Sequence, residues 1–254
     1  MRISINPKYK HLSEFLRQIP NNFDQLGEIV YDERNTIRKI EVEGICLSIK
    51  SFCPPMIINK FAYTFIRPSK AKRSYEYAIK LLQKGIGTPI PIAYIEQRQG
   101  GLLHNSYFVC LHLDFTGMMR EFRWGEIEGR EDLLGSFAHF SAYTHEKGVR
   151  HMDYSPGNIL YKKVDENYRF CLVDINRMAF GKVGIDKGCA NFSRLWGSDE
   201  MLAYIAKEYA LARDYNVEKC VRLTLKYHKA FWEGYSARHN GFKPYLGPTT
   251  ISTK

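Results

Sequence analysis

Apolar and polar residues alternate along much of the first half of the chain. In ICLSIK, residues 45–50, three apolar residues alternate with Cys46, Ser48 and Lys50. This period of two predicts a strand over 45–52, with Lys50 on the face opposite the apolar side chains. Similar runs, separated by polar or glycine turns, predict further strands at 27–32, at 36–43 and, as a pair around a Gly-Gly turn, within 88–114.

Apolar spacings of three and four residues predict helices elsewhere. One is expected over 8–19, ending before Pro20, a second over 70–84, stopping at Gly85, and a third within 131–148. Short strands and loops are expected from 150 to 180, and mostly helix from 190 to 238.

The two patterns divide the chain near residue 114. We expect an α+β fold with two lobes, a small lobe with an antiparallel sheet at 1–113 and a larger, mainly helical lobe at 114–254. The first is expected to bind nucleotide, and the second to carry the catalytic residues and bind the acceptor.

Composition limits the classes of partner that the protein is expected to bind but does not select one of them. The 254 residues are 44% hydrophobic and 25% charged, as in ordinary soluble globular proteins. The net charge of +10 favours an acidic partner: a nucleic acid, an anionic membrane surface or a phosphorylated substrate. No recognisable nucleic-acid-binding module accompanies the charge, so nucleic acid is not an expected partner.

Cysteine usage and hydropathy favour the cytoplasm. The six cysteines form no C-x-x-C pair, which argues against a zinc knuckle or a redox dithiol. The first residues lack the apolar core of a secretory signal, and apolar runs are far shorter than the roughly 20 residues of a membrane span. We expect a cytoplasmic protein with reduced thiols.

The stretch HMDYSPGNIL, residues 151–160, carries the clearest chemical motif. Its H-x-D-x(4)-N spacing places His151, Asp153 and Asn158 in one loop before an apolar run. Asp174 follows at the end of the apolar segment FCLV. Protein-kinase-like phosphotransferases carry these parts in this order. We expect Asp153 to be the catalytic base that orients a hydroxyl and takes its proton, and His151 to support the loop.

ATP and Mg²⁺ are the cofactors that this motif implies. Mg²⁺ prefers oxygen ligands, which Asn158 and Asp174 supply as an amide oxygen and a carboxylate. The phosphates of ATP need a fixed cation, which Lys50 supplies from its predicted strand. Glu76, on the following predicted helix, is the expected partner of Lys50, and Glu96 is a second candidate.

Departures from the protein-kinase pattern favour a non-protein substrate. No G-x-G-x-x-G precedes Lys50, and the first hairpin turn instead contains Arg34, which together with backbone amides is a candidate for covering the phosphates. Met152 replaces the usual arginine, and Ile175-Asn176 replaces Phe-Gly, although asparagine also tolerates a left-handed turn. The form DYSPGN is typical of small-molecule kinases.

Longer stretches resemble the bacterial lipopolysaccharide kinase family, which phosphorylates Kdo or heptose sugars of the inner core. The resemblance is carried by RPSKAKRSYEYAIKLLQKGIGTPIPIAYIE, HMDYSPGNILYK and VDINRM, and covers about 27–200. It implies a protein-kinase-like fold, ATP, Mg²⁺ and a lipid-linked acidic sugar acceptor at the cytoplasmic face of the inner membrane, and the Kdo-kinase branch is the more similar. It implies the same roles for Lys50, Glu76, Asp153, Asn158 and Asp174.

A kinase-like fold also implies where adenine is bound. It is expected between the lobes, in contact with Ser48, Leu160 and Val173. The backbone from Leu111 to Leu113 is expected to supply the hinge hydrogen bonds.

Two groups of basic residues are candidates for contact with an acidic acceptor or an anionic membrane. The first precedes Glu76 and consists of Lys70, Lys72 and Arg73. The second follows Asp174, where kinase-like folds hold the acceptor, and consists of Arg177, Lys182, Lys187 and Arg194.

Three other functions fit parts of the sequence. A phosphotransferase of the aminoglycoside or choline type fits DYSPGN. A protein kinase fits the order of the parts, but no A-P-E follows Asp174. A non-catalytic pseudokinase that binds nucleotide or a partner is the third, although each expected catalytic position has a candidate residue.

Overall fold

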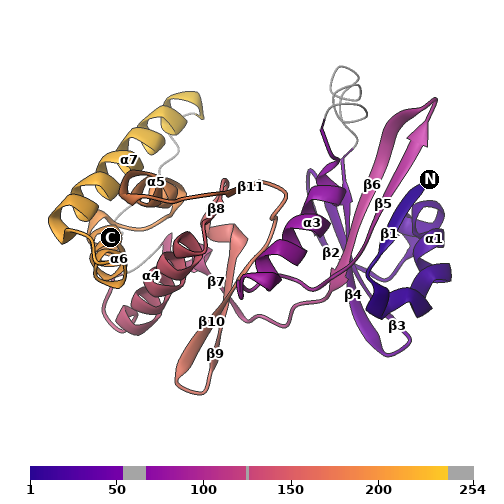
Figure 1. The fold of residues 1–254 in the computed structure, drawn as a ribbon, viewed down its shortest axis with the longest axis horizontal. Coiled ribbons are helices and arrows are strands. Elements are labelled where there is room, and N and C mark those ends of the chain that lie inside the picture. Colours follow the sequence, from indigo (N-terminus) through magenta and orange to yellow (C-terminus); the bar gives the residue numbers. More distant parts are fainter. Residues whose placement is uncertain (54–66, 124–125, 240–254) are drawn as a thin grey trace, which may run out of the picture. The chain divides into compact units, whose positions relative to one another are not determined.

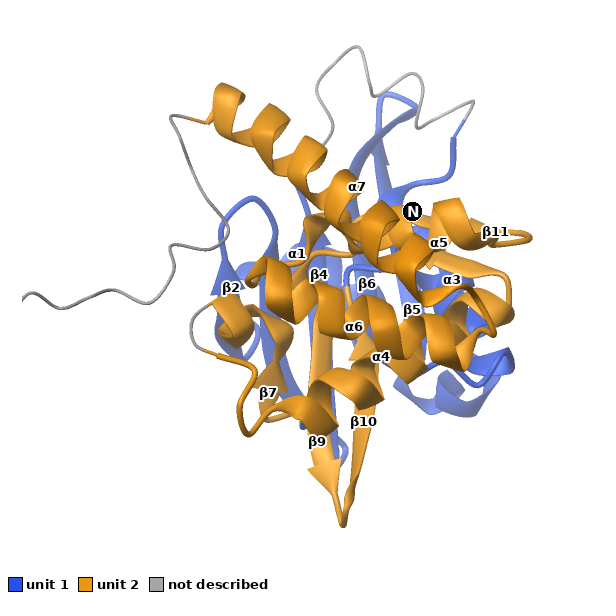
Figure 2. Cartoon of the chain, turned by 90° about the vertical axis from the view of Figure 1, so that its left-hand side faces the viewer, with its two compact units in different colours: residues 1–114, 174–176 blue, residues 115–173, 177–254 orange. Residues whose placement is uncertain are grey.

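The computed structural model describes residues 1–53, 67–123 and 126–239. The chain divides into two compact units, drawn in different colours in Figure 2. The first contains 1–114 and also 174–176, and the second contains 115–173 and 177–254. The chain therefore returns to the first unit for three residues, Asp174–Asn176, before it continues in the second.

The first unit contains an antiparallel sheet whose strands lie in the order β1-β5-β6-β4-β3-β2 (Figure 1). The strands are β1 Arg2–Ile5, β2 Glu28–Asp32, β3 Thr36–Val42, β4 Ile45–Phe52, β5 Pro91–Gln99 and β6 Leu102–Leu111. The five strands predicted in this part are confirmed. Gly100 and Gly101 form the turn between β5 and β6, and both have the positive φ that glycine adopts without strain.

One face of this sheet packs against η1 (Pro7–Leu12) and α1 (Ser13–Asn22). Leu47 and Ile49 of β4 are fully buried there, and Ile45 packs against the same core, as the period of two predicts. The apolar side chains that fill this core are Leu12, Leu16, Ile19, Phe23, Leu47, Ile49, Ile92, Ile95, Tyr107 and Val109. This burial fixes which way β4 faces.

Strand register places Lys50 on the opposite face of the sheet. Lys50 pairs with Phe108, and Phe108 pairs with Tyr94, so these three side chains share one face. The Tyr94 ring contacts Tyr75 of α3 (Lys70–Gln83) at a centroid separation of 5.5 Å. The α3 helix therefore packs on the face that carries Lys50.

Helix α3 begins and ends where its sequence provides caps. The side chain of Ser69 accepts a hydrogen bond from the backbone N–H of Lys72, which satisfies one of the donors exposed at a helix start. Gly85 follows the helix with φ +72°, and the chain turns away there. The helix predicted over 70–84 is confirmed.

Two features of the first unit differ from the prediction. Helix α1 continues through Pro20 to Asn22, because proline removes only one backbone hydrogen bond and the buried side chains of Leu16 and Ile19 hold the last turns on the core. Strand β1 was not predicted. It pairs with β5, and its short alternation of apolar and polar residues is the signal for it.

The second unit is mainly helical. Its helices are α4 Glu131–Glu146, α5 Ile185–Asn191, α6 Asp199–Ala212 and α7 Val217–Arg238. Its strands form two small sheets, β10-β9-β7 and β11-β8. Their bounds are β7 Gly117–Met118, β8 Val149–His151, β9 Ile159–Val164, β10 Asn167–Leu172 and β11 Met178–Phe180. The predicted helix within 131–148, the strands and loops of 150–180 and the mostly helical stretch from 190 are confirmed.

Aromatic rings form the centre of the second unit. Phe137 of α4 stacks on Tyr154, and Phe192 lies edge-on to both Phe137 and Tyr209 of α6. All four residues are at most 2% exposed. Tyr154 follows Asp153 directly, so the loop that carries Asp153 is anchored in the aromatic core.

No helix in the described parts of the chain combines the length and the apolar character needed to cross a bilayer.

Candidate active site

The loop that follows β8 is organised around the ring of His151, which is 1% exposed. Its Nδ1 accepts a hydrogen bond from the backbone N–H of Asp153 at 3.1 Å, so Nε2 carries the proton and donates to the carbonyl of Val173 at 3.0 Å. The ring is therefore held as one neutral tautomer between two segments of backbone. His151 supports the loop in this structure, in the role predicted for it.

Asn158 closes the same loop. Its Nδ2 donates to the carbonyl of Asp153 at 2.9 Å and to the hydroxyl of Ser155 at 3.1 Å. The backbone carbonyl of Asn158 accepts from the N–H of Val173 at 3.0 Å. Because both amide hydrogens point into the loop, Oδ1 is the atom of this side chain that is turned away from it.

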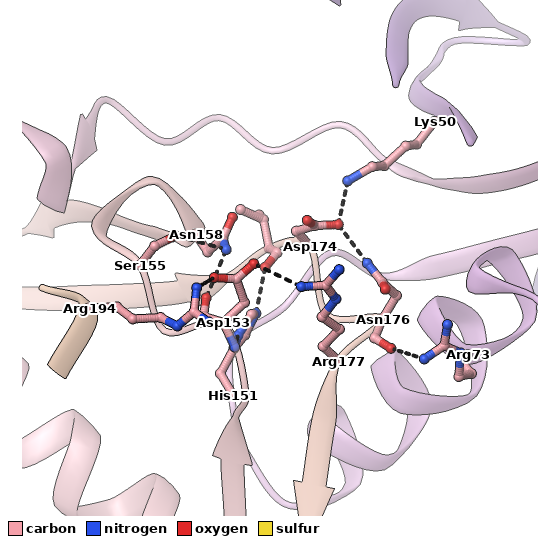
Figure 3. Close-up of polar contacts among 11 residues, drawn as sticks. Lys50, Arg73, His151, Asp153, Ser155, Asn158, Asp174, Asn176, Arg177 and Arg194 are labelled. Carbon is pink, nitrogen blue, oxygen red and sulfur yellow. Dashed lines mark hydrogen bonds and ion pairs between the residues drawn. The ribbon is translucent and has the colours of Figure 1, made fainter. Parts of the chain in front are cut away.

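The carboxylate of Asp153 lies between two arginines (Figure 3). Arg194 donates to Oδ1 at 2.9 Å, and Arg177 lies 3.7 Å from Oδ2. The Asp153 side chain is 24% exposed, whereas Arg177 and Arg194 are 52% and 40% exposed. The loop thus presents a carboxylate at the surface of the second unit with two solvent-accessible cations against it.

A second polar cluster lies in the first unit. Nζ of Lys50 is 2.6 Å from Oδ1 of Asp174, and Asn176 donates to the same oxygen at 2.8 Å. Arg73 of α3 donates to the backbone carbonyl of Asn176 at 2.9 Å. Strand β4 and helix α3 thereby hold the segment Asp174–Asn176, as Figure 3 shows.

Asp174 has a left-handed backbone with φ +51°. Aspartate and asparagine adopt this conformation more readily than other residues that carry a Cβ, and such strain often accompanies functional sites. The left-handed residue of the Asp-Ile-Asn segment is thus the aspartate, whereas we expected that Asn176 could take this conformation. Asn176 instead uses its side-chain amide to hold the Asp174 carboxylate.

Lys50 forms its ion pair with Asp174 and not with Glu76, so the predicted pairing of Lys50 with Glu76 is wrong for this structure. Glu76 lies 3.6 Å from Lys72, one turn earlier on the same helix, and its side chain is 44% exposed. Asp174 occupies the position beside the Lys50 ammonium group instead. Glu96, the second candidate, is 4% exposed on β5 and makes no ion pair with Lys50 among the described residues.

The residues expected to contact adenine lie in different units. In the first, the hydroxyl of Ser48 is 2.9 Å from Nδ1 of His112. The Leu111 N–H donates to Ile90, and the His112 N–H donates to Cys46, so these two amides are already used.

The remaining adenine and phosphate predictions are unchanged. Leu113 follows the end of β6, and Arg34 is exposed in the turn between β2 and β3. In the second unit, Leu160 lies on β9, opposite Cys171 of β10. Val173 uses its N–H to bind Asn158. Contacts of these residues with nucleotide stay predictions.

Within each of the two predicted basic groups, the residues differ in exposure and in the groups they contact. In the first, Arg73 is only 6% exposed and is bound inside the unit, so it is not available at the surface. In the second, Arg177 and Arg194 lie on Asp153, whereas no ion pair of Lys182 or Lys187 with Asp153 occurs in the described part of the chain.

Behind His151 lies a chain of side-chain hydrogen bonds that the sequence did not predict. Asn191 donates to the backbone carbonyl of His151 at 2.9 Å, and its Oδ1 lies 3.1 Å from Nε2 of His145. Nδ1 of His145 lies 2.9 Å from the hydroxyl of Tyr209. Burial lowers the pKa of His145 to about 4, so its ring is neutral at pH 7. The residues come from three helices, and no local spacing in the sequence indicates their contact.

Comparison with solved structures defines the class of fold. A structure of WaaP in complex with acyl carrier protein matches 94% of this chain and 100% of that chain, with a TM-score of 0.61 and 16% identity. A crystal structure of WbdD matches 80% of this chain and 46% of that chain at 18% identity and a TM-score of 0.48. The PknI kinase domain of Mycobacterium tuberculosis matches 76% of this chain and 74% of that chain at 14% identity and a TM-score of 0.41. The match to WaaP, which extends over nearly the whole chain, shows the α+β, protein-kinase-like fold.

The sequence comparison then gives the family. The model of the lipopolysaccharide kinase (Kdo/WaaP) family matches residues 56–201, more than half of the chain. The protein therefore belongs to this family, and the resemblance seen in its motifs is confirmed. No curated protein sequence matches the chain.

Proposed function

We propose that this protein transfers the γ-phosphoryl group of ATP to a sugar hydroxyl of the lipopolysaccharide inner core, with Kdo as the favoured sugar. The observation that carries the proposal is the loop around Asp153. His151 and Asn158 fix its backbone, while its carboxylate faces solvent beside two arginines. Membership of the family favours the inner-core acceptor over the aminoglycoside-type, choline-type and protein acceptors.

Asp153 has the position and chemistry of the general base. A carboxylate that accepts a hydrogen bond from the acceptor hydroxyl orients the oxygen for in-line attack and takes its proton as the O–P bond forms. Arg194 and Arg177 occupy the carboxylate in this structure. The acceptor hydroxyl therefore has to replace or join one of these contacts, and Arg177, at 3.7 Å, is the weaker of the two.

Asn158 and Asp174 fit the donor set that Mg²⁺ requires. The amide hydrogens of Asn158 are held inside the loop, which leaves its oxygen as the outward donor. Asp174 presents a carboxylate whose orientation Asn176 supports. Two protein oxygens with phosphate and water oxygens are a usual Mg²⁺ arrangement. The ion, when bound, supplies charge neutralisation at the phosphates.

Lys50 is proposed to bind the phosphates of ATP. It is 16% exposed on a central strand, and its ammonium group already binds a carboxylate, so the site is built to hold this cation in place. A phosphate oxygen that shares the ammonium with Asp174 would be held at a fixed position relative to β4. This positioning is the main contribution a protein makes to phosphoryl transfer.

Arg177 and Arg194 are proposed to recognise the acid group of the acceptor. Kdo carries a carboxylate, whereas heptose does not, and guanidinium groups bind carboxylates in bidentate geometry. Arg194 is held against Phe231 of α7 at 4.9 Å, which limits its motion, whereas Arg177 is half-exposed. The excess of positive charge favours peripheral contact with the anionic cytoplasmic leaflet, where this acceptor is made.

Phosphate transfer to defined acceptors tests the proposal. Purified protein is incubated with labelled ATP, Mg²⁺ and one acceptor at a time: Kdo–lipid A, the same lipid without Kdo, a heptose-extended lipid, an aminoglycoside or choline. Label that appears only on the Kdo-bearing lipids supports the proposal. Label on the heptose alone would move the acceptor to that sugar. Label on an aminoglycoside or choline, or on none of the lipids despite Mg²⁺-dependent ATP binding, would contradict it.

A further inference from the structure

An open hollow in the second unit has no assigned role. It is lined by Thr116, Met118, Arg120, Glu121, Arg123 and Trp196, and its volume is roughly 610 Å³. All six residues belong to the same unit, and none was a candidate from the sequence. A hollow of this size suits a small molecule or one or two sugar rings rather than a folded partner.

The walls of the hollow combine cations with an aromatic ring. The guanidinium carbons of Arg120 and Arg123 lie 5.6 Å and 5.3 Å from the centre of the Trp196 ring. Arg120 is exposed and makes no ion pair among the residues that the structure describes. Its guanidinium group is therefore positioned by an aromatic contact rather than neutralised by a carboxylate.

Two connections place the hollow beside the Asp153 loop. The Arg120 guanidinium lies against the backbone of Gly157, where a Cβ would come within 2.6 Å of Nη2, and Gly157 directly precedes Asn158. Trp196 is two residues after Arg194, which binds the Asp153 carboxylate. A ligand in the hollow would thus lie beside the loop that carries the proposed base.

The chemistry of the walls indicates the class of ligand. Guanidinium groups bind phosphate through paired N–H donors, and the apolar faces of Trp196 and Met118 suit the C–H face of a sugar ring. The Thr116 hydroxyl and the Glu121 carboxylate suit sugar hydroxyls. A phosphorylated saccharide satisfies all of these groups, whereas free phosphate satisfies only the arginines.

We infer that the Arg120 hollow binds a phosphorylated sugar of the acceptor, adjacent to the sugar that receives the new phosphoryl group. The inference rests on the proposed function, because it extends the acceptor site from one sugar to two. Arg120 is its main anion-binding residue, and a side chain at position 157 would shift the Arg120 guanidinium from its place beside the loop.

Binding without nucleotide tests the inference directly. Calorimetric titration uses three probes: a phosphorylated glucosamine disaccharide without acyl chains, its dephosphorylated counterpart, and inorganic phosphate. The proteins are wild type, Arg120→Gln, Arg120→Lys and Arg222→Gln, the last removing an exposed arginine of α7 outside the hollow. Thermal melting of each variant verifies that it is folded.

The expected result is selective. Arg120→Gln should weaken binding of the phosphorylated disaccharide about tenfold or more, Arg120→Lys should weaken it less, and Arg222→Gln should leave it unchanged. The dephosphorylated probe should bind wild type about tenfold more weakly. Equal affinity of Arg120→Gln and wild type, or inorganic phosphate binding as tightly as the disaccharide, would overturn the inference.

The same proteins separate this inference from the proposed function. If wild type phosphorylates Kdo–lipid A and Arg120→Gln has an unchanged KM for that lipid, the kinase assignment stands and the hollow is not an acceptor subsite. If the disaccharide binds through Arg120 but no lipid is phosphorylated, the subsite stands and the proposed reaction fails.

Discussion

The ammonium group of Lys50 lies 2.6 Å from a carboxylate oxygen of Asp174, although 124 positions separate the two residues in the chain. Strand β4 carries the lysine, and the three-residue segment that rejoins the first unit carries the aspartate. This pair joins a predicted phosphate-binding residue to a predicted Mg²⁺ ligand within one unit.

Removing the carboxylate of this pair should abolish Mg²⁺-dependent nucleotide binding. Asp174→Asn deletes the charge that both Lys50 and the metal require. Wild type should show a rise in melting temperature with Mg²⁺ and ATP, and Asp174→Asn should show none. Glu76→Gln is the comparison, since Glu76 contacts Lys72, and it should keep the rise. An equal loss in Glu76→Gln would restore Glu76 as the essential partner of Lys50.

The ring of His151 should contribute position rather than proton transfer. His151→Ala removes the acceptor for the Asp153 N–H and the donor to Val173, so two partly buried backbone groups lose these partners. Each loss costs about 1–3 kcal/mol, and kcat should fall while the KM for ATP is kept. The shape of the pH–rate profile should be unchanged. A profile that loses a titration step would instead make His151 a chemical participant.

Replacing Arg177 should weaken acceptor recognition alone. Arg177→Gln removes a half-exposed guanidinium next to Asp153, and the KM for the Kdo-bearing lipid should rise about tenfold while the KM for ATP stays constant. Lys187→Gln removes an exposed cation of the same sequence segment and is the matched control. If both variants raise the KM equally, general charge rather than a specific contact governs acceptor binding.

Acid should destabilise the second unit through His145. Its pKa is lowered to about 4 in the folded protein, so between pH 6.5 and 4 the unfolded chain binds a proton that the folded chain does not. The free energy of unfolding should therefore fall as the pH decreases through this window, by up to about 3 kcal/mol. Burial also lowers the pKa of His228, which acts in the same direction.

Urea unfolding at several pH values measures this effect. In His145→Gln the fall in the free energy of unfolding between pH 7 and 4 should be clearly smaller than in wild type. An identical pH dependence in the variant would mean that His145 is not the group that titrates.

Sequence patterns predict the parts of the structure that depend on residues close together in the chain. The alternation in β4 places Lys50 on the correct face because a shift by one residue would expose Leu47 and Ile49. The spacing around Asp153 identifies the loop because the side-chain hydrogen bonds that close it, from His151 and Asn158 to the backbone of Asp153, span only two and five residues.

The sequence could not predict which of several similar side chains come into contact when they are far apart in the chain. Spacing does not tell which carboxylate reaches Lys50, since Glu76 and Asp174 both suit its charge and only the fold brings Asp174 within 2.6 Å. The hydrogen bonds that link Tyr209, His145 and Asn191 likewise depend on the packing of separate helices. Pro20 within α1 shows tertiary burial overriding a local helix-stop signal.

The central claim is that Asp153 is the base of a phosphoryl transfer to an inner-core sugar. It is tested most directly by single-turnover transfer from labelled ATP to Kdo–lipid A by wild type and Asp153→Asn, with Mg²⁺-dependent ATP binding measured on both. We predict equal nucleotide binding and a rate of transfer reduced at least a hundredfold in Asp153→Asn. Transfer by Asp153→Asn at the wild-type rate would contradict the claim.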